Sequence, residues 1–207
     1  MTISGQDALI VIDVQNDFTR GSMAVPGAES VIAPTNRLAP LFPNLVVVTD
    51  WHPPGHVSFA SAYPGARPGD TVSLPYGEQG VWADHCVQGS WGAELDAGLA
   101  LGAAQLLLHK GYRRGVDSYG CFYENDRTTS TGLAGYLRAR GIARVFCAGL
   151  ARFVCVAHSA LGAAQDGFAV MMVNDASAGQ LRDTDAAMRA KLDRAGVGWV
   201  HSRTLTS

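Results

Sequence analysis

The stretch RVFCAGLARFVCVAH, from Arg144 to His158, decides the fold of this chain. Its first part, Arg144 to Gly149, is a short apolar run that ends at a glycine, which is typical of a strand followed by a turn. Its last part opens a helix of small residues and sets Cys155 at the helix N-terminus. The N–H groups and the positive dipole end there favour a thiolate and can bind an oxyanion. Two interpretations of Cys155 stay open: a reactive nucleophile, or a buried cysteine that acts as a small hydrophobic residue.

Three other apolar runs end in polar residues. They are Ala8 to Asp13, Leu45 to Asp50 and Gln105 to Lys110. Continuous Val, Ile and Leu without alternation predict strands that are buried on both faces, as in parallel sheets. Because ligands of open parallel sheets bind outside the carboxyl ends of the strands, we expect one edge of the sheet to gather five side chains. These are Asp13, Asp50, His52, Lys110 and Cys155.

Predicted strands alternate with predicted helices along the whole chain. We expect strands at about 8–13, 45–50, 105–110, 144–149, 169–174 and 196–201. We expect helices at about 29–41, 129–140, 155–167 and 183–195, with Asp183 as the cap of the last helix. This order predicts an α/β fold with a doubly wound, Rossmann-like, mostly parallel six-stranded sheet and helices on both faces. The stretch 52–92 is rich in Gly and Pro, and a connection this long inside a compact domain is usually functional.

The composition narrows the class of protein. With 207 residues, 47% hydrophobic and 16% charged, the chain is expected to form one folded domain over residues 1–207. A net charge of −2 gives no general attraction to nucleic acid or to an anionic membrane. The sequence shows neither a membrane-spanning run nor a signal-type N-terminus, so we expect a cytoplasmic protein. Its four cysteines are then expected to be reduced.

A second pattern concerns metal binding. Asp50 and His52 lie two residues apart on an extended segment, where alternate residues face the same side. A third potential ligand, His85, lies within the 52–92 connection. One carboxylate and two imidazoles suit zinc, iron or manganese with positions left open for water or substrate. The alternative is that Asp50 caps a turn, His52 is an exposed loop residue and His85 makes an interior hydrogen bond.

Together these stretches resemble the nicotinamidase/pyrazinamidase branch of the isochorismatase-like cysteine hydrolases. The catalytic trio alone would indicate the superfamily. The Asp-x-His pair with a later His points to the nicotinamidase branch, because isochorismatase- and carbamoylsarcosine-type relatives lack that metal. The resemblance runs over nearly the whole chain, in Val11–Phe18, Thr49–Pro53, His56–Ser61, Trp82–Gln88, Lys110–Gly111, Val116–Tyr119, Gly149–Ala151, Cys155–Val156 and Asp175–Ala176.

The resemblance implies a catalytic set. Cys155 is then the nucleophile, Asp13 the general acid and base, and Lys110 the third member. The oxyanion hole consists of the backbone N–H groups of Ala151 and Cys155, with a cis peptide bond between Leu150 and Ala151. The implied reaction converts nicotinamide, and also pyrazinamide, to the acid and ammonia through a cysteine thioester, in NAD salvage.

The resemblance also implies a binding site. One divalent ion, zinc before iron or manganese, is held by Asp50, His52 and His85 and holds the pyridine nitrogen of the substrate. Aromatic residues at positions that line the ring pocket of the family are Phe18, Trp82 and Tyr119. His56 and Ser61 lie near positions where some members place a further metal ligand. The implied partner is a small aromatic amide, and family members often form homo-oligomers.

One stretch departs from the family. Arg152, Phe153 and Val154 stand where relatives usually carry Thr-Asp and an aromatic or small residue before the nucleophile. Arg152 could lower the pKa of Cys155, or point outward to an acidic partner. Two rival functions follow: another carboxamide hydrolase in which Arg152 recognises an acidic substrate, and a non-catalytic metal-binding domain. Asp17 and Asp117 are predicted to be structural carboxylates.

Overall fold

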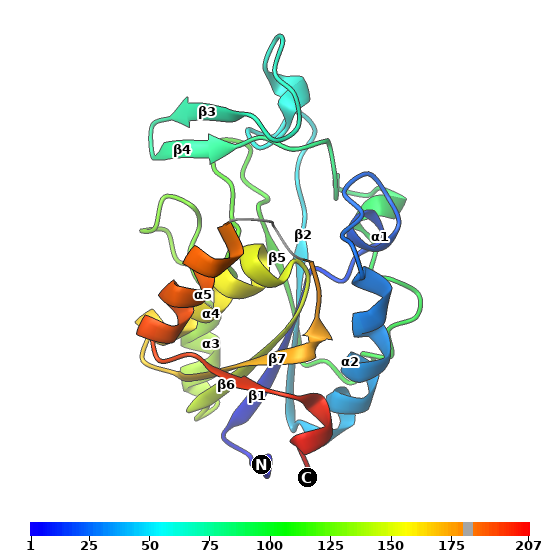
Figure 1. Cartoon of the computed structure of the whole chain (residues 1–207), viewed down its shortest axis with the longest axis vertical. Helices are drawn as coiled ribbons and strands as arrows, with labels where there is room; N and C mark the ends of the chain where they lie inside the picture. The colour runs from blue at the N-terminus through cyan, green and yellow to red at the C-terminus, as the bar shows by residue number, and fades with distance from the viewer. Residues whose placement is uncertain (180–183) are drawn as a thin grey trace.

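The computed structural model of the chain describes residues 1–179 and 184–207 (Figure 1). The main sheet has six strands in the order β5-β2-β1-β6-β7-β8, and every neighbouring pair is parallel. The predicted doubly wound α/β sheet is therefore confirmed. Its strands are β1 (Asp7–Ile12), β2 (Asn44–Asp50), β5 (Leu106–Lys110), β6 (Arg144–Gly149), β7 (Ala169–Ser177) and β8 (Gly198–Val200).

The strand order reverses between β1 and β6, the two central strands. The chain winds outward from β1 through β2 to β5, then returns to the other side of β1 and continues through β6, β7 and β8. Such a reversal leaves a crevice at the carboxyl ends of the two central strands, because the connections that follow them leave in opposite directions. This crevice is where the residues after β1 and β6 meet.

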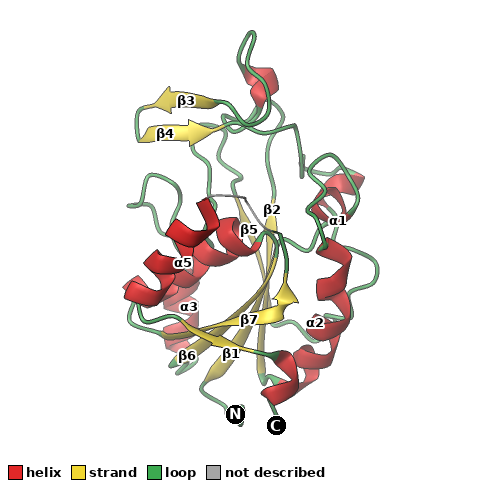
Figure 2. Cartoon of the chain, viewed as in Figure 1, coloured by secondary structure: helices red, strands yellow, loops and turns green. Residues whose placement is uncertain are grey.

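Helices cover both faces of the sheet (Figure 2). Alternate residues of β1 divide between two apolar clusters: Leu9 and Val11 face one, and Ala8, Ile10 and Ile12 face the other. The first cluster lies under α1 (Asn16–Thr19) and α2 (Ile32–Leu38). The second lies under α3 (Leu133–Ala139), α4 (Ala157–Gln165) and α5 (Thr184–Arg194). All residues of β1 are buried, as its unbroken apolar sequence predicts.

Several predicted boundaries need correction. The 52–92 connection is not wholly irregular, because β3 (Thr71–Leu74) and β4 (Gly77–Gly80) form an antiparallel hairpin. This hairpin lies beyond the end of the main sheet opposite the two chain termini (Figure 1). The helix predicted at about 129–140 begins only after Gly132, which has a φ of +90°. The predicted cap Asp183 lies outside the described residues.

The chain also carries shorter helical turns. They are 3-10 turns at Ala28–Val31, Ala39–Leu41, Ala60–Ala62, Trp91–Ala93 and Ser202–Thr204, and a π-helical turn at Arg152–Val156 directly before α4. Over the described ranges, the structure contains no helix both long and apolar enough to cross a membrane. All four cysteines are buried free thiols, as expected.

Candidate active site

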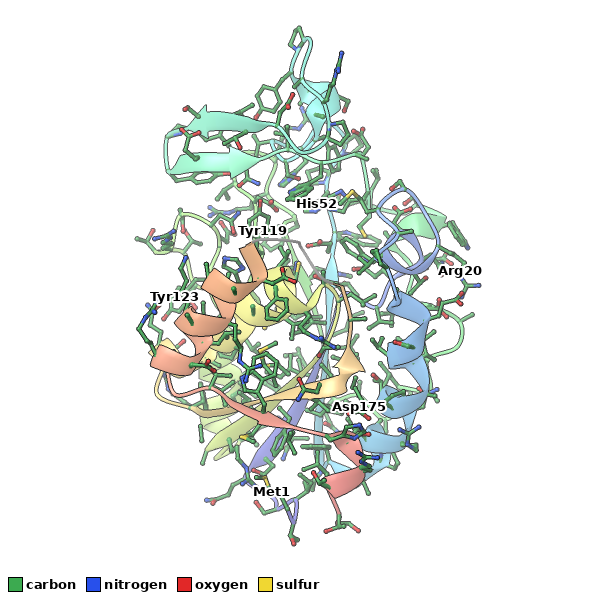
Figure 3. All side chains as sticks on the ribbon, in the orientation of Figure 1. Met1, Arg20, His52, Tyr119, Tyr123 and Asp175 are labelled. Atoms are coloured by element: carbon green, nitrogen blue, oxygen red, sulfur yellow. The ribbon has the colours of Figure 1, made fainter. Side chains whose placement is uncertain are left out.

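Three of the predicted site residues meet at the carboxyl end of the sheet. The Lys110 Nζ atom lies 2.9 Å from Asp13 Oδ2 and 3.7 Å from Cys155 Sγ. It also donates to Asp50 Oδ1 at 2.5 Å and to the carbonyl of Ser118 at 3.0 Å. The labelled His52 and Tyr119 lie below the β3–β4 hairpin (Figure 3).

The sheet itself places these side chains. Asp50 and Lys110 are the last residues of β2 and β5, and they are register partners in adjacent strands. Asp13 follows β1 directly and has a φ of +54°, which lets the chain turn sharply at the end of the strand. Gly149 ends β6 with a φ of +118°, and a Cβ there would lie 2.0 Å from the Ile12 carbonyl. The close approach of β1 and β6 therefore requires glycine.

The turn after β6 carries the thiol. The peptide bond between Leu150 and Ala151 is cis, as the family resemblance implied. The π-helical turn then brings Cys155 to the sheet edge with 7% of its surface exposed. Asp13 is fully buried and Lys110 is 1% exposed. Water is thus almost excluded from all three groups.

Burial controls where the proton resides in this cluster. It raises the pKa of Asp13, the negative charge of Asp50 raises it further, and Lys110 offsets part of the effect, to give about 7. Burial also raises the pKa of the Cys155 thiol well above its usual value, against the opposing charge of Lys110. The thiol is therefore protonated in the free protein. Asp13 can exchange a proton near neutral pH, which suits a general acid and base.

Asp50 behaves differently from Asp13. Burial would raise its pKa, but Lys110 and the two neighbouring histidines together lower it. One of its oxygens contacts Lys110, and the other lies 3.7 Å from His52 Nε2 and 3.9 Å from His85 Nε2. Asp50 thus joins the cysteine cluster to a group of three potential metal ligands.

The donor set of this group fits a divalent metal ion. The Nδ1 atoms of His52 and His85 donate to the carbonyls of Gly111 and Ala83, at 2.8 Å and 2.7 Å. In a neutral imidazole this hydrogen bond leaves the lone pair on Nε2, which lies within 3.9 Å of Asp50 Oδ2, as in protein metal sites where a second hydrogen bond fixes the imidazole. Ligand bonds of about 2.1 Å in a tetrahedral site require donor atoms about 3.4 Å apart. The Asp50–imidazole separations are close to that value.

The two additional candidates lie elsewhere. Ser61 Oγ donates to Asp84 Oδ1 at 2.5 Å and is exposed, outside the three-ligand group. His56 stacks on His52 with ring centroids 4.3 Å apart and forms a neighbouring group with His52 and Asp117. Its Nδ1 atom already contacts Ser58 Oγ at 2.7 Å.

One cavity connects the thiol with the candidate metal ligands. Its volume is about 90 Å³, well below the range for drug-sized ligands, so it suits a small molecule. Cys155 and Ala151 line one part, and Asp50, His52 and His85 line another. The three predicted aromatic residues, Phe18, Trp82 and Tyr119, all line it, together with Asp117, Met23, Val25 and Val154.

The sequence did not single out Gln15 or the small apolar lining residues. Gln15 is fully buried, accepts from the Asp50 backbone N–H at 2.8 Å and donates to the Asp50 carbonyl at 2.8 Å. It also donates to the carbonyl of Ala93 at 2.9 Å. In the sequence, the only indication of its role is its position two residues after Asp13, the last residue of a predicted strand. Met23 and Val25 had no periodic signal at all.

Asp17 and Asp117, which are predicted to be structural carboxylates, lie in different parts of the site. Asp17 accepts from the backbone N–H groups of Cys86 and Ser22, at 2.8 Å and 3.2 Å, and so fastens the loop that carries His85. Asp117 accepts from Ser118 N–H and from Gln79 Nε2 at 2.7 Å and 2.9 Å, but it also lines the cavity. Both make the hydrogen bonds expected of a structural role.

Arg152 makes its hydrogen bonds to β7 and not to the active-site cluster. Its guanidinium donates to the carbonyls of Asn174 and Ser177 at the end of β7. The charges that affect the pKa of Cys155 are those of Lys110, Asp13 and Asp50. Arg152 is also absent from the described lining of the cavity. Arg152 therefore lies away from the thiol, and it lines a separate hollow together with Asn174 and Ser177.

Comparison with known proteins assigns this fold to a family. Residues 7–202 match the model of the Isochorismatase domain, so the chain belongs to the isochorismatase family. Within that family it is similar to the nicotinamidase of Acinetobacter baylyi, with 50% identity over 170 residues, which cover 82% of this chain and 79% of the relative.

The fold of the chain is also similar to solved structures of nicotinamidases and pyrazinamidases. A nicotinamidase and pyrazinamidase of Acinetobacter baumanii superposes with a TM-score of 0.95 at 41% identity, covering 97% of this chain and 98% of that one. A protein from L. infantum in complex with nicotinate has a TM-score of 0.88 at 36% identity, covering 100% and 98%. The pyrazinamidase of Pyrococcus horikoshii in complex with zinc has a TM-score of 0.77 at 28% identity, covering 95% and 99%.

Proposed function

We propose that this protein is a nicotinamidase, which hydrolyses nicotinamide to nicotinate and ammonia and cleaves pyrazinamide in the same way. The observation that carries the proposal is the shared cavity, with Cys155 on one side and the candidate metal ligands Asp50, His52 and His85 on the other. A pyridine ring with a carboxamide substituent presents two groups that match these two sides. The similar nicotinamidases and the nicotinate-bound relative support this substrate class.

The first chemical step forms the thioester. The Cys155 thiol gives its proton to Asp13 as Sγ attacks the carboxamide carbon, and the C=O electron pair moves onto oxygen. The Ala151 and Cys155 N–H groups donate to that oxyanion. Lys110, 3.7 Å from the sulfur, stabilises the developing thiolate. Asp13 then gives the proton to the amide nitrogen, the C–N bond breaks and ammonia leaves.

The second step restores the enzyme. A water molecule attacks the thioester carbon and gives a proton to Asp13. The C–S bond then breaks, nicotinate leaves and the thiol regains the proton from Asp13. A carboxyl group with a pKa of about 7 is suited to accept and return a proton in both steps.

The remaining residues bind and orient the ring. Asp50, His52 and His85 would hold one divalent ion, zinc before iron or manganese, and this ion supplies a Lewis-acid contact for the pyridine nitrogen. Phe18, Trp82 and Tyr119 line the cavity and would enclose the ring. Trp82 Nε1 donates to Tyr119 Oη at 3.3 Å, which fixes the two rings relative to each other.

We also propose a domain organisation, a metabolic role and a cellular compartment for the enzyme. We infer one domain over residues 1–207, with 52–92 as its metal-binding insertion, which acts in NAD salvage in the cytoplasm. The four free thiols agree with a reducing compartment. The rival function requires Arg152 to recognise an acidic substrate. The hydrogen bond of the Arg152 guanidinium to β7 argues against that role.

Ammonia release from nicotinamide tests the proposal. The zinc-loaded protein should release ammonia, prior chelation should reduce the rate strongly, and Cys155→Ala should abolish it. Cys147→Ala is the matched control, because Cys147 is a fully buried thiol in the middle of β6 and should leave turnover nearly unchanged. Turnover that survives in Cys155→Ala, or no release from the zinc-loaded protein, would contradict the proposal.

A further inference from the structure

The segment that carries the oxyanion-binding N–H groups is fastened to β7 through Arg152. This segment, Ala151 to Cys155, lies between the end of β6 and α4. The backbone N–H of Arg152 donates to the Ala178 carbonyl at 2.7 Å. Its guanidinium donates to the Asn174 carbonyl at 2.8 Å and to the Ser177 carbonyl. Three hydrogen bonds from one residue thus reach a single five-residue stretch.

An irregularity in β7 makes these carbonyls available. Cys147 pairs with Met172 and Gly149 with Ser177, so β7 advances five residues while β6 advances two. Such a bulge turns backbone groups out of the regular ladder. A buried carbonyl without a donor costs about 1–3 kcal/mol. Both side-chain bonds come from Nη2 of the guanidinium, whose two N–H groups point in different directions and so reach two separate acceptors at once.

The residue that follows Ala178 also packs closely against this segment. Gly179 has a φ of +91°, and a Cβ there would lie 3.1 Å from Ala151 Cβ and 2.5 Å from Val25 Cγ1. Gly179, just beyond the end of β7, therefore packs closely against Ala151. Ala151 in turn lines the cavity. A displacement of this end moves the Ala151 N–H group, and an oxyanion hole requires its donors within about 2.7–3.1 Å of the oxygen.

We propose, on the basis of the function proposed above, that Arg152 is a positioning residue of the amide hydrolysis. It holds the 151–155 segment against the bulged end of β7, so that the two N–H groups stay aimed at the oxyanion. Its guanidinium acts through the backbone and touches neither the substrate nor the thiol. In this chain an arginine–carbonyl clamp does this work in place of the short polar pair expected before the nucleophile.

Hydrogen exchange tests the clamp without reference to any substrate. In Arg152→Met, a side chain of similar length without donors, amide exchange of a peptide spanning 150–157 should become at least about tenfold faster. Exchange in β1 and β2 should stay as in the wild type. Arg138→Met is the matched control, since Arg138 also donates to a backbone carbonyl, that of Asp166, far from the site. Unchanged exchange of 150–157 in Arg152→Met would overturn the proposal.

Steady-state kinetics and the affinities of two ligands test whether the clamp keeps the oxyanion-binding N–H groups in place. Arg152→Met should lower kcat for nicotinamide by about 10- to 100-fold while KM changes less than about threefold, because the lost interaction acts in the transition state. Pyridine-3-carbaldehyde adds the thiol across its C=O bond and needs the oxyanion donors, so its affinity should fall in parallel with kcat. Nicotinate, which undergoes no addition, should bind as tightly as to the wild type.

The outcomes separate the clamp from the proposed function. Equal losses of aldehyde and nicotinate affinity would show a general pocket defect and would refute a positioning role. Arg152→Lys keeps the charge and one donor nitrogen on a shorter side chain, so it should recover part of kcat. It replaces the Met variant if that variant does not fold. A wild type inactive on nicotinamide would contradict the proposed function, whereas the exchange result would still decide whether Arg152 holds the segment.

Discussion

Gly111 lies directly against the imidazole of His52 at the end of β5. Its φ is +63°, and a Cβ there would lie 2.4 Å from His52 Cε1 and 2.7 Å from Nδ1. Its carbonyl accepts the His52 Nδ1–H hydrogen bond at 2.8 Å. The same residue thus makes room for the ring and fixes its tautomer, which leaves Nε2 for a metal ion.

We expect Gly111→Ala to weaken metal binding. The added methyl group must push His52 away or break its hydrogen bond, and loss of such support typically costs about 10- to 100-fold in metal affinity. Zinc affinity measured by chelator competition should fall by that factor. Gly115→Ala is the control, since it lies in the same loop and a Cβ there meets nothing within 4 Å. Equal affinities in the two variants would show that Gly111 does not position His52.

At the scale of elements, one ion pair joins β1 to β6 at the end of the sheet opposite the site. Asp7 and Arg144 are register partners, and Arg144 Nε donates to Asp7 Oδ1 at 2.7 Å. Asp7 is 2% exposed and also accepts from the Ser4 N–H and Oγ, at 2.7 Å and 2.9 Å. Burial opposes ionisation of this carboxyl, but these hydrogen bonds outweigh it and lower the pKa of Asp7.

We expect Asp7→Asn to reduce stability in a pH-dependent way. The lowered pKa means that ionised Asp7 stabilises the folded state above the unfolded pKa of about 3.9. That contribution disappears as the pH falls below this value and through the folded pKa. Urea unfolding should show a loss of about 1–3 kcal/mol at pH 7 that shrinks toward pH 3. Exposed Glu94→Gln serves as the control, and a loss independent of pH would exclude the ion pair as its cause.

At the scale of the whole molecule, the candidate metal ligands come from distant parts of the chain. Asp50 ends β2, and His85 follows the β3–β4 hairpin, so an ion bound to both joins the insertion to the main sheet. A ligand that binds the folded state alone stabilises that state by mass action. Metal binding should therefore be visible in global unfolding as well as in turnover.

Zinc should raise the melting temperature of the chelator-stripped protein. At a free concentration 100 times Kd the stabilisation is about 2.7 kcal/mol. For a chain of this size, this corresponds to a rise of about 5–11 °C. Differential scanning calorimetry measures it, and His85→Ala should remove most of the rise. A similar rise in His85→Ala would place the ion elsewhere.

Much of the architecture follows from local sequence patterns. The unbroken apolar runs of β1, β2 and β6 predicted a parallel sheet, because strands buried on both faces need no polar alternation. Polar residues at their ends predicted an edge that gathers Asp13, Asp50, Lys110 and Cys155, and these side chains do meet there. A parallel sheet brings all carboxyl ends to one side whatever the details of packing.

The sequence by itself thus determined the six strands of the main sheet, their buried faces, the edge at which the polar side chains meet and the family resemblance. The tertiary structure alone decided that Gln15 clamps the backbone of Asp50, that Arg152 bonds to β7, and that Met23 and Val25 line the cavity. The reason is that local periodicity reports which face of an element is buried. Hydrogen bonds between residues 22 to 78 positions apart, and the lining of a cavity, depend on how distant segments pack.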